Sequence, residues 1–217
     1  MKRNDLKNVM NTLPICFSCN ELAYLALTGK VENQVRDKLA YLINQRYKDW
    51  RVTREWNRAD IAIFKNKSKE PTIIELKAII TFDAVKPKKD PGKELRNSLN
   101  GTKGLRPDMK RWKQGKRLKH GVKQVFGIML AAHPSKEILE NLERLKIVKY
   151  ADDIKKFWPK EERDNKKWLE DCCKKLGKYD GLWDVGRYWG IGMEVAFWIL
   201  PRKHTRRHYQ GHAIRRK

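Results

Sequence analysis

Residues 58–78 of the chain read RADIAIFKNKSKEPTIIELKA, two short apolar runs separated by a charged connection. The connection, residues 65–71, contains turn-forming residues, so the stretch predicts two strands joined in a hairpin that brings Asp60 alongside the second run. Alternate side chains of a strand share a face, which places Glu75 and Lys77 together. Ionised groups inside an apolar strand are costly to bury unless they are paired or bind a metal ion. The stretch therefore predicts a charged site built into a sheet.

The overall composition sets the class of protein. The chain has 217 residues, of which 40% are hydrophobic, which suits one domain with a single core. No apolar run approaches the roughly 18 residues that a membrane span needs. The N-terminus has no continuous apolar segment of the kind found in signal peptides. We therefore expect no membrane partner and a cytoplasmic or nucleoid-associated location.

The net charge of +24 arises from 50 basic and 26 acidic residues. Two segments carry most of it: Lys86–Lys123 has a charge of +11 and Arg202–Lys217 has +7. Lys and Arg release counterions when they bind phosphates, so the excess predicts a polyanionic partner. A merely solubilising surface is the alternative.

The periodicity of apolar residues predicts a helix over Val31–Tyr47, strands over Trp50–Trp56, Asp60–Lys65 and Thr72–Ile80, a helix over Pro107–Lys119 and a buried strand over Val122–Ala132. Before them, Met1–Ser18 is expected to be irregular, and Asn20 is expected to cap a short helix over Glu21–Leu27 that ends at Gly29. Phe82–Arg106 is expected to be a long basic loop.

Towards the C-terminus, helices are expected over Ser135–Ile147 and Pro159–Leu176, followed by a hairpin of Leu182–Trp189 and Met193–Leu200. These elements divide the chain into an N-terminal extension (1–30), a core (31–134), C-terminal helices with a hairpin packed on that core (135–201), and a basic tail (202–217). The expected fold class is α/β (α+β), with a central mixed sheet flanked by helices in the order α-β-β-β-α-β.

This order of elements resembles the PD-(D/E)xK nuclease superfamily, whose fold is the restriction-endonuclease-like fold. The residues that carry the resemblance are Glu32 in the first helix, Asp60 in the second strand, and Glu75 and Lys77 in the third. The resemblance covers about Val31 to His133. In one place the chain departs from the family pattern, because Ala59 and not proline precedes the acid.

The resemblance implies a site for Mg²⁺, with Mn²⁺ able to substitute. Asp60 and Glu75 would be the metal ligands, together with the main-chain carbonyl of Leu76. Lys77 would orient the attacking water and stabilise the scissile phosphate, and Glu32 matches a helix acid that many members use for a second metal or a bound water. Hydrolysis of a phosphodiester requires such charge neutralisation and an activated water. The alternative makes Asp60 a strand-start residue and Glu75–Lys77 an exposed salt bridge.

The basic segments supply candidate contacts to nucleic acid. Lys110, Lys113 and Gln114, in the helix after the third strand, are candidates for backbone phosphate contacts, and Arg206 and Arg207 in the tail are candidates for phosphate or groove contacts. For each single lysine, a solvated surface position is the alternative. The aromatic segment Leu182–Trp198 is expected to be core, with a dimer surface or base stacking as alternatives.

The positions of the cysteines are compatible with a zinc site but do not establish one. Cys16 and Cys19 have half of a zinc-site spacing, and His204 and His208 have a matching histidine spacing, but nothing in the sequence brings the two pairs together. Reduced thiols are the alternative. Cys172 and Cys173 are expected to be small core residues.

Together these observations predict a Mg²⁺-dependent endodeoxyribonuclease, a hydrolase of DNA phosphodiester bonds. A type II restriction-like homodimer is the leading subtype, and a repair or junction-cutting nuclease of the same fold is the next. A non-catalytic basic nucleic-acid-binding protein is the alternative from another class. The acid cluster separates the classes, because inward carboxylates would repel the phosphates that a simple binder must attract.

Overall fold

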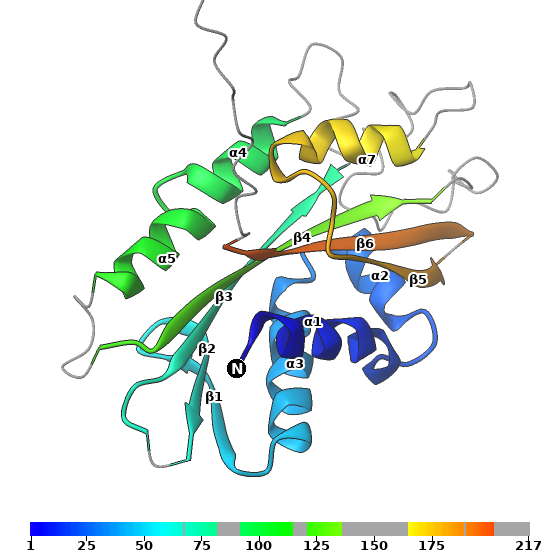
Figure 1. The fold of residues 1–217 in the computed structure, drawn as a ribbon. Coiled ribbons are helices and arrows are strands. Elements are labelled where there is room, and N and C mark those ends of the chain that lie inside the picture. Colours follow the sequence, from blue (N-terminus) through cyan, green and yellow to red (C-terminus); the bar gives the residue numbers. More distant parts are fainter. Residues whose placement is uncertain (67, 82–91, 115–120, 136–164, 189, 202–217) are drawn as a thin grey trace, which may run out of the picture.

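A single mixed sheet of six strands forms the centre of the molecule (Figure 1). The computed structural model describes residues 1–66, 68–81, 92–114, 121–135, 165–188 and 190–201. The strands lie in the order β1-β2-β3-β4-β6-β5, and β3 and β4 are parallel whereas the other neighbours are antiparallel. Their bounds are Trp50–Trp56 (β1), Ala59–Lys65 (β2), Thr72–Ile80 (β3), Gln124–Pro134 (β4), Gly181–Tyr188 (β5) and Ile191–Leu200 (β6). The predicted mixed sheet flanked by helices is therefore confirmed.

Helices cover both faces of this sheet. Figure 1 shows α1, α2 and α3 on one side and α4, α5 and α7 on the other. Their bounds are Arg3–Thr12 (α1), Glu21–Thr28 (α2), Glu32–Arg46 (α3), Lys93–Asn100 (α4), Leu105–Lys113 (α5) and Asn165–Cys173 (α7), with 3₁₀ turns at Leu13–Cys16 and Lys174–Leu176. None of the helices in the described ranges has both the length and the apolar composition that crossing a membrane requires.

The predicted elements of the central region are confirmed with small shifts of their ends. The helix expected at Val31–Tyr47 is α3, and the strands expected at Trp50–Trp56 and Thr72–Ile80 are β1 and β3. The C-terminal hairpin is also present as β5 and β6. Its second strand pairs with β4 from Met193 to Leu200, so the hairpin extends the central sheet, and most of β6 is buried. The prediction that this aromatic segment is core is confirmed for β6.

Two predictions near the N-terminus were wrong. Residues 3–12 form α1 and not irregular chain; Pro14 lies only in the following 3₁₀ turn, where a proline near the helix start is tolerated. The apolar side chains of α1 are at most 1% exposed and belong to the same core as the sheet. The helix predicted after Asn20 exists and ends at Gly29, but Asn20 makes no side-chain cap. Instead, the Glu21 carboxylate accepts hydrogen bonds from the Ser18 N–H and hydroxyl, each at 2.8 Å.

The prediction of a loop over Phe82–Arg106 was wrong for residues 93–100, which form α4. Leu95 and Leu99 bury one side of this short helix, so tertiary packing stabilises it despite the surrounding glycine and asparagine. The helix predicted at Pro107–Lys119 begins two residues earlier, at Leu105, and is described as far as Lys113. Three predicted segments lie outside the described residues: residues 136–147 of the helix expected from Ser135, the start of the one expected at Pro159, and the tail after Pro201.

A glycine in β4 allows α5 to lie close to the sheet. A Cβ atom at Gly127 would meet Met109 Sδ at 2.5 Å and Leu105 Cγ at 3.0 Å, both on α5. Gly127 is the register partner of Glu75 in the parallel β3–β4 pair. The close approach therefore places α5 directly over the charged stretch of β3.

Candidate functional site

The two edges of β3 are bonded differently. Along one edge, β3 pairs with β4 over its whole length, from Thr72 to Ile80. Along the other edge, the ladder with β2 contains three residue pairs and ends at Ile61 opposite Ile74. Beyond Ile74 this second edge has no partner strand among the described residues. We call it the free edge of β3. It begins at Glu75, the first predicted site residue of this strand.

Carboxylates take the place of the missing strand along the free edge. The main-chain N–H of Leu76 donates to Asp60 Oδ2 at 2.7 Å, and that of Ala78 donates to Glu32 Oε2 at 3.0 Å. Because buried backbone donors must be paired, these two acids satisfy N–H groups that a continuing ladder would have bonded. Side chains from β2 and α3 are thereby fixed next to each other along one strand.

The β1–β2 turn aims Asp60 at this edge. Trp56 pairs with Ala59, so Asn57 and Arg58 are the two central residues of the turn, and both have positive φ, 49° and 71°. Positive φ at both central positions is typical of the type I′ turn, which matches the twist of a hairpin. Asp60 is the second residue of β2, one position before Ile61, where the β2–β3 ladder stops.

Glu75 lies deep in the site. It is only 4% exposed, and its Oε1 accepts a hydrogen bond from Nε1–H of Trp112 on α5. Burial and, to a smaller extent, the neighbouring Asp60 carboxylate together raise the pKa of Glu75 to about 8. Asp60 and Glu75 therefore form an adjacent pair of carboxyl groups, in which the buried Glu75 holds its proton to a higher pH than an exposed glutamate does.

Lys77 pairs across the free edge with the first helical residue of α3. Its Nζ lies 3.1 Å from Glu32 Oε1, and the two side chains are 26% and 22% exposed. The alternative prediction of an exposed Glu75–Lys77 salt bridge was wrong, because Glu75 is buried and bonded to α5 while Lys77 bonds to α3. Lys77 is partly exposed to solvent and lies beside the buried acid pair.

The four predicted catalytic residues are thus brought together at one edge. Asp60 and Glu75 lie side by side, and Lys77 and Glu32 adjoin them. Within the described ranges, however, no group of three or more His, Cys, Asp or Glu side chains is arranged to hold a metal ion. Glu32 belongs to the Lys77 pair, so the acid pair is a two-carboxylate set.

This set fits a hard cation of the Mg²⁺ type. Mg²⁺ prefers oxygen ligands, keeps several waters and is commonly bound by one or two carboxylates. Asp60 and Glu75 are two carboxylates that would supply such ligands, and the main-chain carbonyl of Leu76 lies between Glu75 and Lys77 in the same strand. Burial and the Asp60 charge raise the pKa of Glu75 despite the opposing effect of Lys77, and a divalent cation at the pair would favour the ionised carboxylates.

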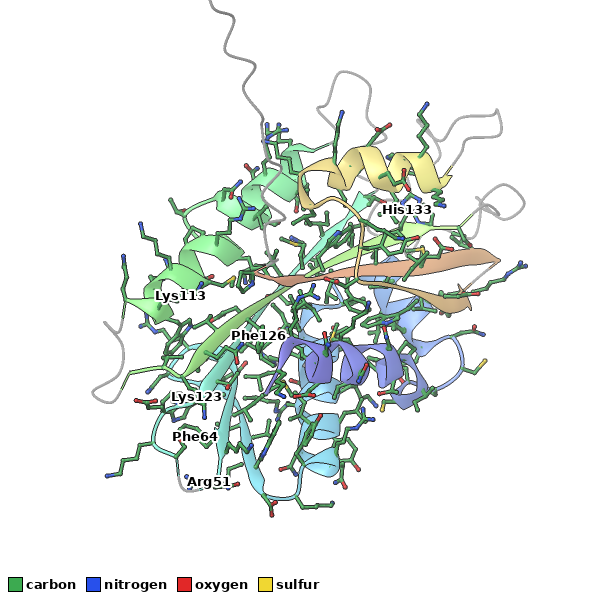
Figure 2. The ribbon with its side chains drawn as sticks, in the orientation of Figure 1. Arg51, Phe64, Lys113, Lys123, Phe126 and His133 are labelled. Carbon is green, nitrogen blue, oxygen red and sulfur yellow. The ribbon has the colours of Figure 1, made fainter. Side chains whose placement is uncertain are left out.

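The predicted phosphate-binding residues lie on or next to α5. Lys110, Lys113 and Gln114 are all exposed, at and beyond the C-terminal half of that helix, and Figure 2 labels Lys113 at its end. They lie on the helix that carries Trp112, so they flank the site without entering it. Arg206 and Arg207 lie outside the described residues.

The cysteines do not join the site. All four are free; Cys16 is partly exposed and Cys19 is exposed, whereas Cys172 and Cys173 are buried. His204 and His208 lie outside the described residues, so a zinc site with Cys16 and Cys19 stays an open prediction. Burial raises the pKa of the Cys172 thiol to about 12, which makes it inert as a nucleophile. The prediction that Cys172 and Cys173 are core residues is confirmed.

Sequence reasoning missed one side chain of the site. Trp112 lies within the helix predicted over Pro107–Lys119, where the sequence indicated no role for it in the site, yet it is the hydrogen-bond partner of Glu75. Trp112 is 1% exposed, and a buried tryptophan usually finds a partner for its N–H. The only signal in the sequence was therefore a tryptophan in a helix expected to pack on the sheet. The partner itself depends on how α5 packs on β3.

Comparisons of the chain with protein-family models, with curated proteins and with solved structures gave no match.

Proposed function

We propose that the protein is a divalent-metal-dependent nuclease that hydrolyses phosphodiester bonds in DNA, with a core of the restriction-endonuclease-like kind. The observation that carries the proposal is the acid pair Asp60–Glu75 at the free edge of β3, with the Lys77–Glu32 pair beside it. These are two carboxylates suited to a hard cation and one lysine next to them. Such groups can provide the charge stabilisation and the activated water that phosphodiester hydrolysis requires.

Each residue has a distinct role in this proposal. Asp60 and Glu75 hold Mg²⁺, which supplies Lewis-acid stabilisation of the phosphate and an activated water. Lys77 carries a positive charge at the mouth of the site and stabilises negative charge on the phosphate as it reacts. Glu32 orients the Lys77 ammonium group, and Trp112 orients the Glu75 carboxyl group.

DNA is the proposed substrate because the chain carries a net charge of +24 and exposes lysines on the helix that flanks the site. Carboxylates repel phosphates, so a protein that only binds DNA gains nothing from inward-facing acids beside its basic surface. Their presence therefore favours a catalytic function over simple binding. The proposed subtype is a type II restriction-like enzyme acting as a homodimer. The free thiols suit a reducing compartment, so the proposed setting is the cytoplasm.

Cleavage of supercoiled plasmid by the full chain tests the proposal. We expect nicking or linearisation in Mg²⁺ or Mn²⁺ and none in EDTA. Asp60→Asn keeps an oxygen that can accept from the Leu76 N–H but removes the charge, and should lower the cleavage rate by at least about 100-fold. Lys77→Gln keeps a donor for Glu32 and should lower the rate to a similar extent.

Asp49→Asn and Lys48→Ala are matched controls, because both residues are exposed and follow α3 at the far end from Glu32. Both should cleave as the wild type does. The absence of cleavage of any DNA by the wild type would reject the nuclease and favour a non-catalytic nucleic-acid-binding protein. Undiminished cleavage by Asp60→Asn and Lys77→Gln would place the active site elsewhere.

A further inference from the structure

A continuous row of basic and amide side chains follows α4 and α5. On α4, Lys93, Arg96 and Asn100 recur at a spacing of three and four residues, and on α5 Arg106, Lys110 and Lys113 recur at four and three. Residues at this spacing share one side of a helix. The buried side chains of the two helices, Leu95, Leu99, Leu105, Met109 and Trp112, point away from this row into the core. We call these six polar residues the basic row.

The acids in the same segment do not cancel its charge. Residues 92–114 contain seven Lys or Arg and two acids. Glu94 pairs with Lys30 at 3.2 Å, and Asp108 pairs with Arg111, which lies outside the basic row. Lys93, Arg106, Lys110 and Lys113 are exposed, so their charges reach solvent. The row is therefore a positively charged surface on well-packed helices.

The two helices are held in a fixed relation. Arg106 Nη1 donates to Asn100 Oδ1 at 3.2 Å, which joins the α4 and α5 parts of the row. The turn between them is tight: a Cβ atom at Gly101 would lie 2.5 Å from the Asn97 carbonyl oxygen, and one at Gly104 would lie 2.8 Å from the Gly101 carbonyl oxygen. Figure 1 shows α4 and α5 following one another along the same side of the molecule. The spacing of the charges is thus set by the fold.

We propose that the basic row binds the sugar–phosphate backbone of one strand of double-stranded DNA. A span of seven helical residues covers about 10 Å at 1.5 Å per residue, which corresponds to about three nucleotides at the 3.4 Å rise of one strand. Each half of the row therefore matches a short run of regularly spaced phosphates. Rigid, regular spacing suits a duplex better than a flexible single strand.

The row also lies close to the proposed active site. Trp112 faces inward from α5 to Glu75, whereas Lys110 and Lys113, two positions before it and one after it, belong to the outer row. A duplex on the row therefore lies beside the acid pair, separated from it by no more than the diameter of α5, about 10 Å. The choice of DNA among polyanions rests on the proposed nuclease function. The contact itself is a binding property and does not require cleavage.

Binding measured in EDTA separates the row from catalysis. Fluorescence anisotropy would follow the affinity of the full chain for a labelled 20-base-pair duplex and for its single strand as the salt concentration is raised. The test variant carries Lys93→Gln, Lys103→Gln, Lys110→Gln and Lys113→Gln, with Lys103 taken from the exposed turn between the helices. For the duplex, each lost phosphate contact should reduce the slope of log K against log salt by about 0.9, and we expect a reduction of about 2–4.

A control variant carries the same change in net charge at exposed lysines on other elements: Lys48→Gln, Lys69→Gln, Lys174→Gln and Lys175→Gln. Its duplex slope should fall by less than 1. Circular dichroism verifies that both variants are folded. Equal slopes for the two variants would overturn the proposal, and so would a loss confined to the single strand.

The two proposals fail separately. Normal plasmid cleavage with equal slopes would leave the nuclease in place and reject the basic row. A reduced duplex slope in a protein that cleaves no DNA would support the row as a duplex-binding surface and reject the nuclease.

Discussion

The two edges of β3 differ in their hydrogen-bond partners. One edge contributes to the stability of the sheet, and the other carries the candidate functional site. On the β4 side, nine consecutive residues pair with another strand and buried apolar side chains pack around them. On the other side, the ladder ends at Ile74, and carboxylates from Asp60 and Glu32 take the backbone N–H groups. A paired edge satisfies its hydrogen bonds with backbone alone, whereas the free edge does so with charged side chains that remain available for a ligand.

The first prediction concerns a substitution at the paired edge. Leu130 in β4 is fully buried, and Leu130→Ala should lower the free energy of unfolding by about 2–5 kcal/mol because it leaves a cavity. Chemical denaturation measures this loss. At a temperature where the variant is folded, its affinity for Mg²⁺ should equal that of the wild type; a large loss of affinity would show that the two edges are not separable.

The second prediction concerns the buried acid. The raised pKa of Glu75 means that the folded protein holds a proton that the unfolded chain releases above about pH 4.5. Without divalent cations, stability should therefore fall as pH rises from about 4.5 to about 8. Glu75→Gln should remove this dependence and stabilise the metal-free protein at pH 8 by on the order of 2 kcal/mol. Denaturation in EDTA at several pH values would reveal it, and an unchanged profile in the variant would refute the assignment.

The third prediction removes the indole donor while keeping an aromatic ring. Trp112→Phe leaves the buried Glu75 carboxyl group without its hydrogen bond, which should cost about 1–2 kcal/mol of stability. It should also weaken Mg²⁺ binding, because Glu75 is no longer held in one orientation. Trp56→Phe, in an edge strand, is the matched control. Equal effects of the two substitutions on Mg²⁺ affinity would mean that Trp112 only fills space.

The smallest effect is expected at the partly exposed pair. Glu32→Gln retains an oxygen that can accept from the Ala78 N–H but removes the charge that pairs with Lys77, and should cost about 0.5–1 kcal/mol of stability. Thermal unfolding at low and high salt measures this cost. A loss of more than about 3 kcal/mol would mean that the pair behaves as a buried one.

The sequence correctly predicted those features of the fold and of the candidate site that depend on a local pattern of residues. Alternation in residues 72–80 predicted β3 and the shared face of Glu75 and Lys77, and the turn residues before it predicted that Asp60 comes close. Helical periodicity likewise predicted α3 and with it the place of Glu32. These relations depend on the period of a strand or helix, which the residue order contains.

What depends on packing could not be predicted. Helix α4 has only two buried leucines and sits among helix-breaking residues, so its propensity is weak and its contacts with α5 and the sheet stabilise it. Trp112 reaches Glu75 because Gly127, in the neighbouring strand β4, has no side chain and lets α5 pack close to the sheet. The pairing of Lys77 with Glu32 in place of Glu75 likewise depends on where α3 begins relative to the free edge.

The central claim is that Asp60 and Glu75 hold a divalent cation at the free edge of β3. Isothermal titration calorimetry with Mn²⁺ or Mg²⁺, at pH 7 in two buffers of different ionisation enthalpy, tests it most directly. The account predicts one cation per chain, release of a proton as the cation replaces it on Glu75, and loss of binding in both Asp60→Asn and Glu75→Gln. No binding by the wild type, or equal binding by the wild type and both variants, would contradict it.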